Sequence, residues 1–445
     1  MNQEIKDEYF AAFEKDYEKT LGNTISSNAA IIMGPKASSK NQKREGELTP
    51  NFSIEVDGGE VTNQKKSGRC WMFSGLNVVR LAIMKKTGIK NLELSQSYLM
   101  FFDKLEKANS FLEYILDTRE LDTKSREVSG LLAKGIEDGG YWSYFVALVN
   151  KYGVLPKENM PETYSSSLSA EMNAALNRKA REFAMVLRNE SKKGASLDSL
   201  RKEKEDMMKT FFRILVVTLG LPPKAFDFEC RDKDNKFLKD SNITPLAFFK
   251  KYAPEGVDSV VSVVNDPEEG REFGKTYSLQ FARNVVGTRE CTFLNAPIER
   301  LKELAILSLK DGKALWFACD VLADSDRKDG VLSTKLFEED KLFGTAFIQN
   351  KGERLSYRQS VSNHAMTLVG VDLDKDGNPL KWKIENSWGD EVGKKGFFLM
   401  DDEWFSEYVY EVDVDKKYLT EEEKENYGKK PAMLPFYDPM CCTLD

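Results

Sequence analysis

Hydrophobic residues recur at spacings of three and four through the first half of the chain, the spacing of one face of an α-helix. One such pattern starts at Cys70 and stops at Gly88, a residue that commonly ends helices. A second helix is expected after a Ser95 cap, and a third over 130–155, broken by a glycine pair. Near the N-terminus, the shared apolar face of residues 9–17 predicts one helix, followed by a polar connection to about residue 45.

Helical spacing continues after Pro161 and then gives way to strand-like runs. We expect one helix capped by Ser169, a longer one over 197–219, and a third that starts at Thr244-Pro245. From about residue 286 the apolar runs become short and β-rich, at 314–318, 365–371, 380–384 and 396–400. Helices first and strands later, in 445 residues, predict an α+β protein with two lobes and a helical insertion between them.

Composition and charge narrow the function. The net charge is −7 and the pI about 5.3, which argues against a protein that binds nucleic acid by neutralising phosphates. No apolar run approaches the ~18 residues of a membrane span, and the charged N-terminus lacks the apolar core of a signal peptide. We therefore expect no membrane partner. The six cysteines show no CxxC pairing, so we also expect a reducing, cytoplasmic location.

The chain contains one histidine, His364, which excludes HExxH and Cys₂His₂ zinc sites. Residues 372–377 resemble the start of a calcium loop, but Lys383 stands where that loop needs a bidentate Glu. We therefore expect no metal and no cofactor, and any histidine-dependent chemistry within this chain must use His364.

Cys70 is the strongest candidate nucleophile. It stands at the start of a predicted helix, where the helix dipole and free N–H groups lower a thiol pKa, and Arg69 adds positive charge. Gln64, six residues upstream, is close enough to form an oxyanion hole with the Cys70 N–H. The alternative is a buried structural cysteine beside Trp71.

His364 starts an apolar strand, from which its ring can project into a cleft. Asn386 follows 22 residues later and can accept a hydrogen bond from His364 Nδ1–H, while Trp388 can shield that bond from water. The alternative is a hydrogen-bonded structural histidine. The order cysteine, histidine, asparagine is the chain order of papain-like cysteine proteases.

Longer strings carry a specific resemblance over nearly the whole chain. They are VTNQKKSGRCWMF (61–73), ELSQSYLMFFDKLEKAN (93–109), DGGYW (138–142), KYGVLPKENMPET (151–163), SNHAMTLVGV (362–371), KIENSWG (383–389) and LPFYDPM (434–440). With these the sequence resembles the papain-like cysteine peptidases, and within them the bleomycin hydrolase / aminopeptidase C branch. The resemblance implies a papain fold with a helical insertion and a homohexameric ring with interior active sites.

The resemblance also implies five regions. These are an N-terminal helix and arm (1–45), a helical lobe with the nucleophile (46–165), a helical insertion (166–285), a β-rich lobe with the histidine and asparagine (286–430) and a C-terminal tail in the cleft (431–445). The expected function is a cysteine aminopeptidase acting on peptides, with bleomycin-type amides as further candidate substrates. Gly139 and Gly140 would let a peptide lie against the cleft wall, and Asp445 would face the substrate's free amine.

Two departures from the family pattern stand out. The tail ends in Cys441-Cys442-Thr443-Leu444-Asp445 where small residues are usual, and Tyr141 replaces a usual glutamine in DGGYW. Two other functions are weighed. A transglutaminase-like acyl transferase generally has aspartate where this chain has Asn386, and a ring-shaped scaffold or nucleic-acid binder fits poorly with the acidic pI and an intact cysteine–histidine–asparagine set.

Overall fold

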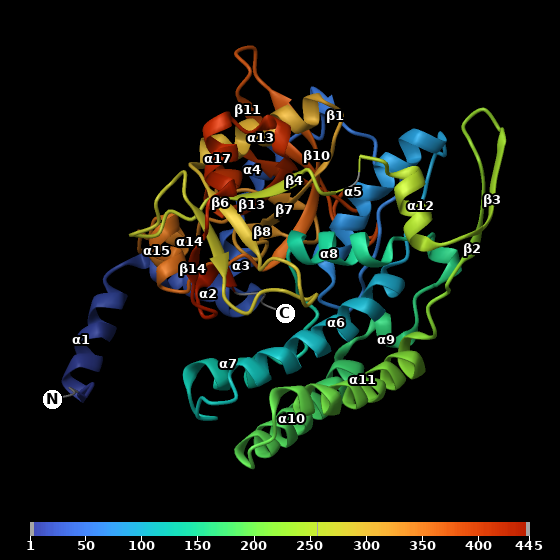
Figure 1. Ribbon diagram of the computed structural model, residues 1–445. Helices are drawn as coiled ribbons and strands as arrows, with labels where there is room; N and C mark the ends of the chain where they lie inside the picture. Colours follow the sequence, from blue (N-terminus) through green and yellow to red (C-terminus); the bar gives the residue numbers. More distant parts are fainter. Residues whose placement is uncertain (1–3, 256, 442–445) are drawn as a thin grey trace.

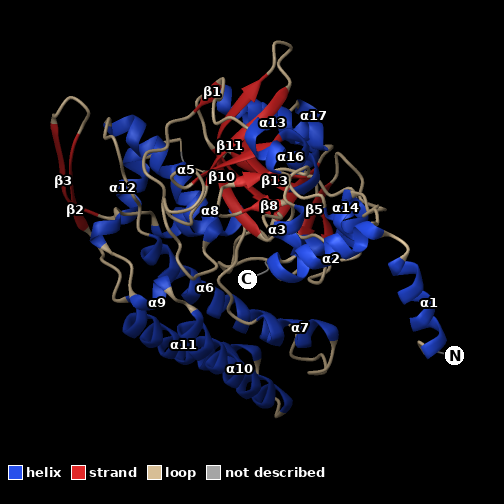
Figure 2. Ribbon diagram, turned by 180° about the vertical axis from the view of Figure 1, so that it is seen from behind, coloured by secondary structure: helices blue, strands red, loops and turns tan. Residues whose placement is uncertain are grey.

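The structure, a computed structural model, describes residues 4–255 and 257–441. Helices dominate the first half of the chain, and most of the strands lie in the second half (Figures 1 and 2). The α+β class is therefore confirmed as a mixed fold with a large sheet, while the division into two lobes and five regions stays a prediction. Among the described residues, no helix has the length and apolar character to cross a membrane.

The N-terminal region contains more helix than expected. α1 (Asp7–Glu18) is followed by α2 (Leu21–Met33), α3 (Pro35–Ser39) and α4 (Gln42–Glu47), so the expected polar connection is wrong. No residue of α1 or α2 is buried, and α1 projects away from the rest of the chain (Figure 1). The apolar residues of α2 do not face a core within this chain, and their spacing did not predict this helix.

The nucleophile helix is α5 (Cys70–Thr87), which ends at Gly88 in a left-handed conformation, as predicted. α6 (Gln96–Asp117) begins after Ser95, whose side chain accepts a hydrogen bond from Tyr98 N, so that cap is also confirmed. The expected helix over 130–155 is two helices, α7 (Arg126–Lys134) and α8 (Trp142–Tyr152), and the glycine pair lies in the loop between them. The apolar residues of α8 share one core with those of α5 and α6.

Residues 166–285 are only partly helical. Short helices η1 (Lys157–Asn159) and α9 (Tyr164–Ser167) lead into α10 (Ala170–Lys192) and α11 (Leu197–Leu219), which lie side by side below α6. α12 (Pro245–Tyr252) has the expected Thr244 cap, but Ser169 bonds Asp138 instead of capping α10. The hairpin β2 (Phe226–Arg231) and β3 (Phe237–Ile243) and the strands β4 (Val260–Val264) and β5 (Thr276–Leu279) were not expected.

The large sheet has the order β14-β5-β6-β4-β13-β7-β10-β11-β12-β9-β8, with β1 paired to β10. Strands β7 (Leu315–Cys319), β10 (His364–Leu373), β11 (Pro379–Glu385) and β12 (Phe397–Asp401) are the four predicted runs. The remaining strands are β1 (Ile54–Glu55), β6 (Thr292–Asn295), β8 (Ser325–Asp326), β9 (Val331–Leu332), β13 (Val409–Asp415) and β14 (Ala432–Leu434).

The second half of the chain also contains helices, some of which pack against the sheet. These are α13 (Ile298–Lys310), α14 (Glu339–Phe343), α15 (Lys351–Ser356), α16 (Asp402–Tyr408) and α17 (Glu421–Gly428), with the short turns η2 (Lys416–Tyr418) and η3 (Pro439–Cys441). The two faces of the central strands enter different cores: Phe317, Met366 and Val412 pack in one, and Trp316, Ala318 and Ala365 in the core shared with α5. The candidate site lies on the face of these strands that packs against α5.

Candidate active site

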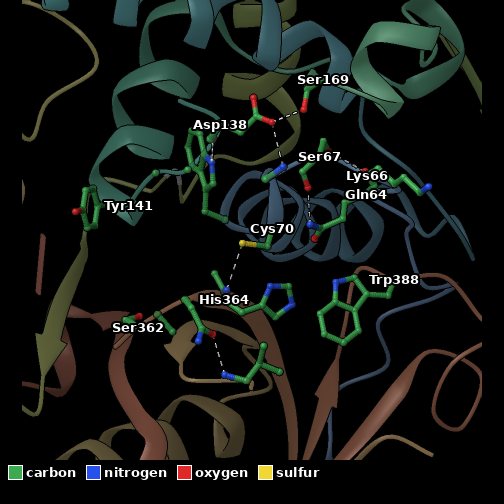
Figure 3. Close-up of a pocket in the computed structure, with 18 of the residues that line it drawn as sticks. Gln64, Lys66, Ser67, Cys70, Asp138, Tyr141, Ser169, Ser362, His364 and Trp388 are labelled. Atoms are coloured by element: carbon green, nitrogen blue, oxygen red, sulfur yellow. Dashed lines mark hydrogen bonds between the residues drawn. The ribbon is translucent and has the colours of Figure 1, made fainter. Parts of the chain in front are cut away.

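Cys70 is the first residue of α5 and is half-buried where that helix meets the sheet. The first N–H groups of a helix have no partner within it, so Cys70 lies in a positive local field. Across the cleft, the backbone N–H of Ala365 on β10 donates to Cys70 Sγ at 3.5 Å (Figure 3). Two segments that are 295 residues apart therefore meet at the sulfur atom.

His364 begins β10, and its ring is held from two sides. Nε2 lies 2.9 Å from Asn386 Oδ1, and the Trp388 indole packs against the imidazole with ring centres 4.8 Å apart. The expected bond to Nδ1 is thus corrected: Nε2 contacts the amide, which leaves Nδ1 as the ring nitrogen for chemistry with Cys70. Burial lowers the pKa of His364 to about 4, and the bond to Asn386 offsets part of that effect.

Gln64 is fixed by hydrogen bonds from both ends of its amide. Nε2 donates to the Ser67 carbonyl at 2.7 Å, and Oε1 accepts from Ser387 Oγ at 2.7 Å. Its backbone N–H also donates to the Ser387 carbonyl, which ties the loop before α5 to the segment after β11. The next residue, Lys65, has a φ of 54°, a conformation that non-glycine residues seldom adopt. The structure brings Gln64 to the Cys70 cleft, as expected.

Asp138 holds the opposite side of the same loop, a role that the sequence did not reveal. It forms an ion pair with Lys104 at 2.5 Å and accepts from Gly68 N at 3.1 Å and from Ser169 Oγ. Burial alone would raise the pKa of Asp138, but the Lys104 charge and these hydrogen bonds hold it well below its ordinary value. Its backbone carbonyl accepts from Trp71 Nε1 at 2.8 Å, so Asp138 positions both flanks of Cys70.

A cavity of about 650 Å³ opens at Cys70. Gly139 and Gly140 line this cavity, together with Tyr141, His364 and Trp388, which Figure 3 labels. A Cβ atom on Gly140 would lie 2.6 Å from the Trp71 indole, so glycine is required there for packing as well as for access. The structure therefore brings the predicted site residues together, apart from Asp445, which lies outside the described residues.

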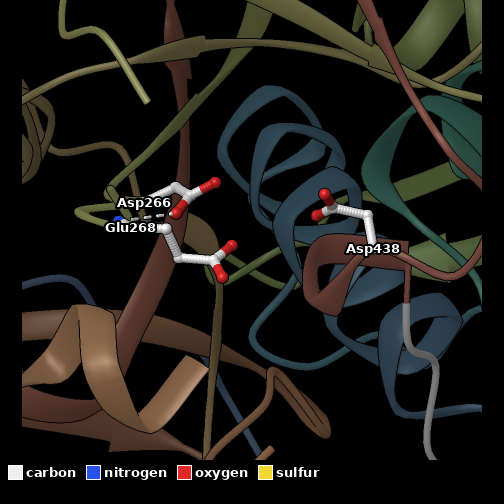
Figure 4. A group of neighbouring side chains, drawn as sticks. All are labelled: Asp266, Glu268 and Asp438. Carbon is white, nitrogen blue, oxygen red and sulfur yellow. Dashed lines mark hydrogen bonds between the residues drawn. The ribbon is translucent and has the colours of Figure 1, made fainter. Parts of the chain in front are cut away.

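The C-terminal tail reaches this cavity. β14 pairs with β5, and η3 places Met440 in the cavity wall. Asp438 lies with Asp266 and Glu268 in a group of three carboxylates (Figure 4). Arg271 forms ion pairs with all of them, at 3.0 Å to Asp266, 3.8 Å to Glu268 and closest to Asp438. Because Arg271 forms an ion pair with each of the three carboxylates, we interpret the group as the anchor of the tail.

Comparisons with known proteins place this chain among the cysteine peptidases. Residues 4–441 match the Peptidase C1-like family, and the chain belongs to it. Aminopeptidase C of Streptococcus thermophilus is 43% identical over 96% of both chains, and human bleomycin hydrolase is 42% identical over 87% of both. The crystal structure of pepw from Lactobacillus rhamnosis HN001 is 44% identical, with a TM-score of 0.97 over 99% of this chain and all of that one. The predicted resemblance and the assignment to cysteine-type aminopeptidases are confirmed.

Proposed function

We propose that this chain releases N-terminal residues from peptides through a Cys70–His364–Asn386 mechanism. The observation that carries the proposal is that the chain's single histidine bonds Asn386 and starts the strand whose next N–H contacts Cys70 Sγ. The Cys70 thiolate attacks the amide carbonyl, and the His364 imidazolium donates its proton to the departing amine. Water then hydrolyses the thioester, with His364 as the base. The Cys70 N–H and Gln64 Nε2 stabilise the oxyanion.

In this proposal the C-terminal tail limits the enzyme to removing N-terminal residues. A cleft open at both ends would accept internal peptide bonds, whereas here Met440 of the tail lines the cavity, and we expect the tail to close one end of the cleft. The terminal carboxylate and Asp445 would then face the substrate's α-ammonium, a charge-assisted contact that an internal bond cannot make. The homohexamer, the cytoplasmic location and bleomycin-type amides as substrates remain predictions from the family resemblance.

Hydrolysis of aminoacyl fluorogenic amides tests the mechanism. The purified chain should cleave an unblocked amide, and both a thiol alkylator and Cys70→Ala should reduce kcat at least a thousandfold, because only binding and the oxyanion donors remain. Cys319→Ala, which changes a buried cysteine near the cleft, is the matched control and should stay active. Substantial hydrolysis by Cys70→Ala would contradict the mechanism.

Deletion of 441–445 tests the role of the tail. The shortened chain should lose activity on unblocked amides and gain cleavage of N-terminally blocked peptides. If it still requires a free N-terminus and keeps its activity, the tail does not determine the exopeptidase character.

A further inference from the structure

Glu411 on β13 is a cleft carboxylate that the proposed mechanism does not use. It lines the cavity that opens at Cys70, and its side chain is buried. Oε1 has no hydrogen-bond partner among the residues that the structure describes. The other carboxylate in the cavity wall, Asp138, differs in this respect because both of its oxygens are bonded within the chain. A buried, unpaired carboxylate oxygen is costly, so it indicates a missing partner.

The register of the sheet connects Glu411 to the nucleophile. Ala365, whose N–H contacts Cys70 Sγ, is paired with Ala318 on β7, and Ala318 is paired with Glu411 on β13. Paired residues project from the same face of a sheet, and both alanines line the cavity. Two strand spacings place the Glu411 backbone about 10 Å from that of Ala365. The two small side chains therefore leave a trough that runs from the sulfur atom to the carboxylate.

The surroundings of Glu411 leave its negative charge without a cationic partner. On the same strand lies Asp413, which accepts from Ser262 Oγ at 2.6 Å and whose Oδ2 has no hydrogen-bond partner among the described residues. Burial and the neighbouring Glu411 charge raise the pKa of Asp413 well above its ordinary value. Burial also raises the pKa of Glu411 to about 7, and hydrogen bonds with Ser262 and Asp413 offset part of that effect. Asp413 is therefore the member of the pair that retains its proton, and a cation that enters the cleft would stabilise the ionised form of Glu411.

We propose that Glu411 is a specificity-determining residue that binds the cationic side chain of a substrate whose N-terminal residue is arginine or lysine. This inference rests on the proposed function, because it requires the scissile carbonyl to lie at Cys70. The α-ammonium is only two bonds from that carbonyl carbon and stays near Cys70. An extended arginine or lysine side chain spans roughly 6–7 Å, and it can follow the trough to Glu411.

The test compares arginyl and citrullyl fluorogenic amides, which have the same shape and differ in charge. For the unaltered enzyme kcat/KM should be at least about tenfold higher for arginyl, since a hydrogen bond to a buried charged group is commonly worth a factor of this size. Glu411→Gln should reduce that ratio to near one. Asp413→Asn is the matched control: it removes a neighbouring carboxyl that does not line the cavity, and the arginyl preference should persist.

Binding separates failure of this inference from failure of the proposed function. Calorimetry with Cys70→Ala should show tighter binding of argininamide than of citrullinamide, and the double variant with Glu411→Gln should bind both alike. An unaltered enzyme that prefers citrullyl, or treats both substrates equally, overturns the role of Glu411. An arginyl preference that survives Glu411→Gln in a folded protein overturns it as well. If no aminoacyl amide is cleaved, the proposed function fails, and the binding comparison still decides the inference.

Discussion

Two sets of polar groups lie around the cleft, the organised wall and the open wall, and they differ in their hydrogen bonding. Around Cys70, the Gln64 amide and the Asp138 carboxylate are bonded at both ends to the protein itself. In the second set, the open wall, the Tyr141 hydroxyl and Glu411 Oε1 are buried and have no hydrogen-bond partner among the described residues. The first wall is organised before substrate arrives, as electrostatic stabilisation of a transition state requires. The second wall leaves its polar atoms for something that enters the cleft.

Among the variants that keep Cys70, the largest effect should come from Gln64. Gln64→Ala removes the proposed oxyanion donor, and kcat for an aminoacyl amide should fall about 10²–10³-fold with little change in KM. Gln64→Glu keeps the size and the Ser387 contact but replaces the donor by an acceptor, so it should be impaired to a similar degree.

Ser387→Ala is the matched control on the same wall. It removes only the bond to Gln64 Oε1 and should reduce kcat by less than about tenfold. Equal losses in Gln64→Ala and Ser387→Ala would mean that Gln64 acts by holding the loop and not by donating to the oxyanion.

The protonation of His364 offers a second test of the organised wall. Since the chain has one histidine, NMR reports its ring without ambiguity. In Cys70→Ala the ring should titrate near pH 4, because burial lowers its pKa. In the unaltered enzyme a thiolate would stabilise the imidazolium, so the ring should remain protonated above pH 6.5.

Stability gives an independent check on the Cys70→Ala variant. The unfolded chain gains a proton on His364 below about pH 6.5 while the folded chain gains it only near pH 4. The free energy of unfolding should therefore fall as the pH drops across this window, by up to roughly 3 kcal/mol. Identical titrations of the His364 ring in Cys70→Ala and in the unaltered enzyme would show that no thiolate–imidazolium pair exists.

The anchor of the tail should give a smaller effect. Asp438→Asn keeps the acceptor for Met440 N but removes the ion pair with Arg271. A charge-assisted bond is worth ~1.5–3 kcal/mol, so release of the tail should become about ten- to a hundredfold more frequent, and cleavage of blocked peptides should rise accordingly. Glu268→Gln alters the same group 3.8 Å from Arg271 and should change little. Equal behaviour of both variants would contradict the anchor.

The sequence predicts the parts of the fold that local pattern controls. Cys70 as the first helical residue and the caps Ser95 and Thr244 follow from local chemistry, and all agree with the structure. The helix α2 was missed because its apolar residues face outward. The strands β4 and β5 were missed because each has a partner far away in the chain: β4 pairs with β13, and β5 pairs with β14. Long-range pairing leaves no local signal.

The site shows the same limit. Residue type and order predicted Cys70, His364 and Asn386, which lie together in the structure, whereas Glu411, the specificity residue that we propose, was not predicted. The run Val-Tyr-Glu-Val-Asp-Val-Asp over 409–415 shows strand alternation, which would place its acidic residues in solvent. Instead both faces of β13 are covered, so Glu411 is buried against the cleft. Only the sheet order shows this, because β13 is a central strand between β4 and β7.

Tyr141 should give the smallest effect and tests the open wall directly. Its hydroxyl is buried without a partner among the described residues, and an unpaired buried hydroxyl carries a desolvation penalty. Tyr141→Phe should therefore leave the melting temperature equal or higher and change kcat/KM for an unblocked amide less than about threefold. Tyr410→Phe is the matched control, because the Tyr410 hydroxyl lies 2.7 Å from Ser360 Oγ, and losing that bond should cost about 1 kcal/mol. If Tyr141→Phe destabilises the chain as much as Tyr410→Phe does, the Tyr141 hydroxyl already has a stabilising partner, and the contrast between the two walls does not extend to it.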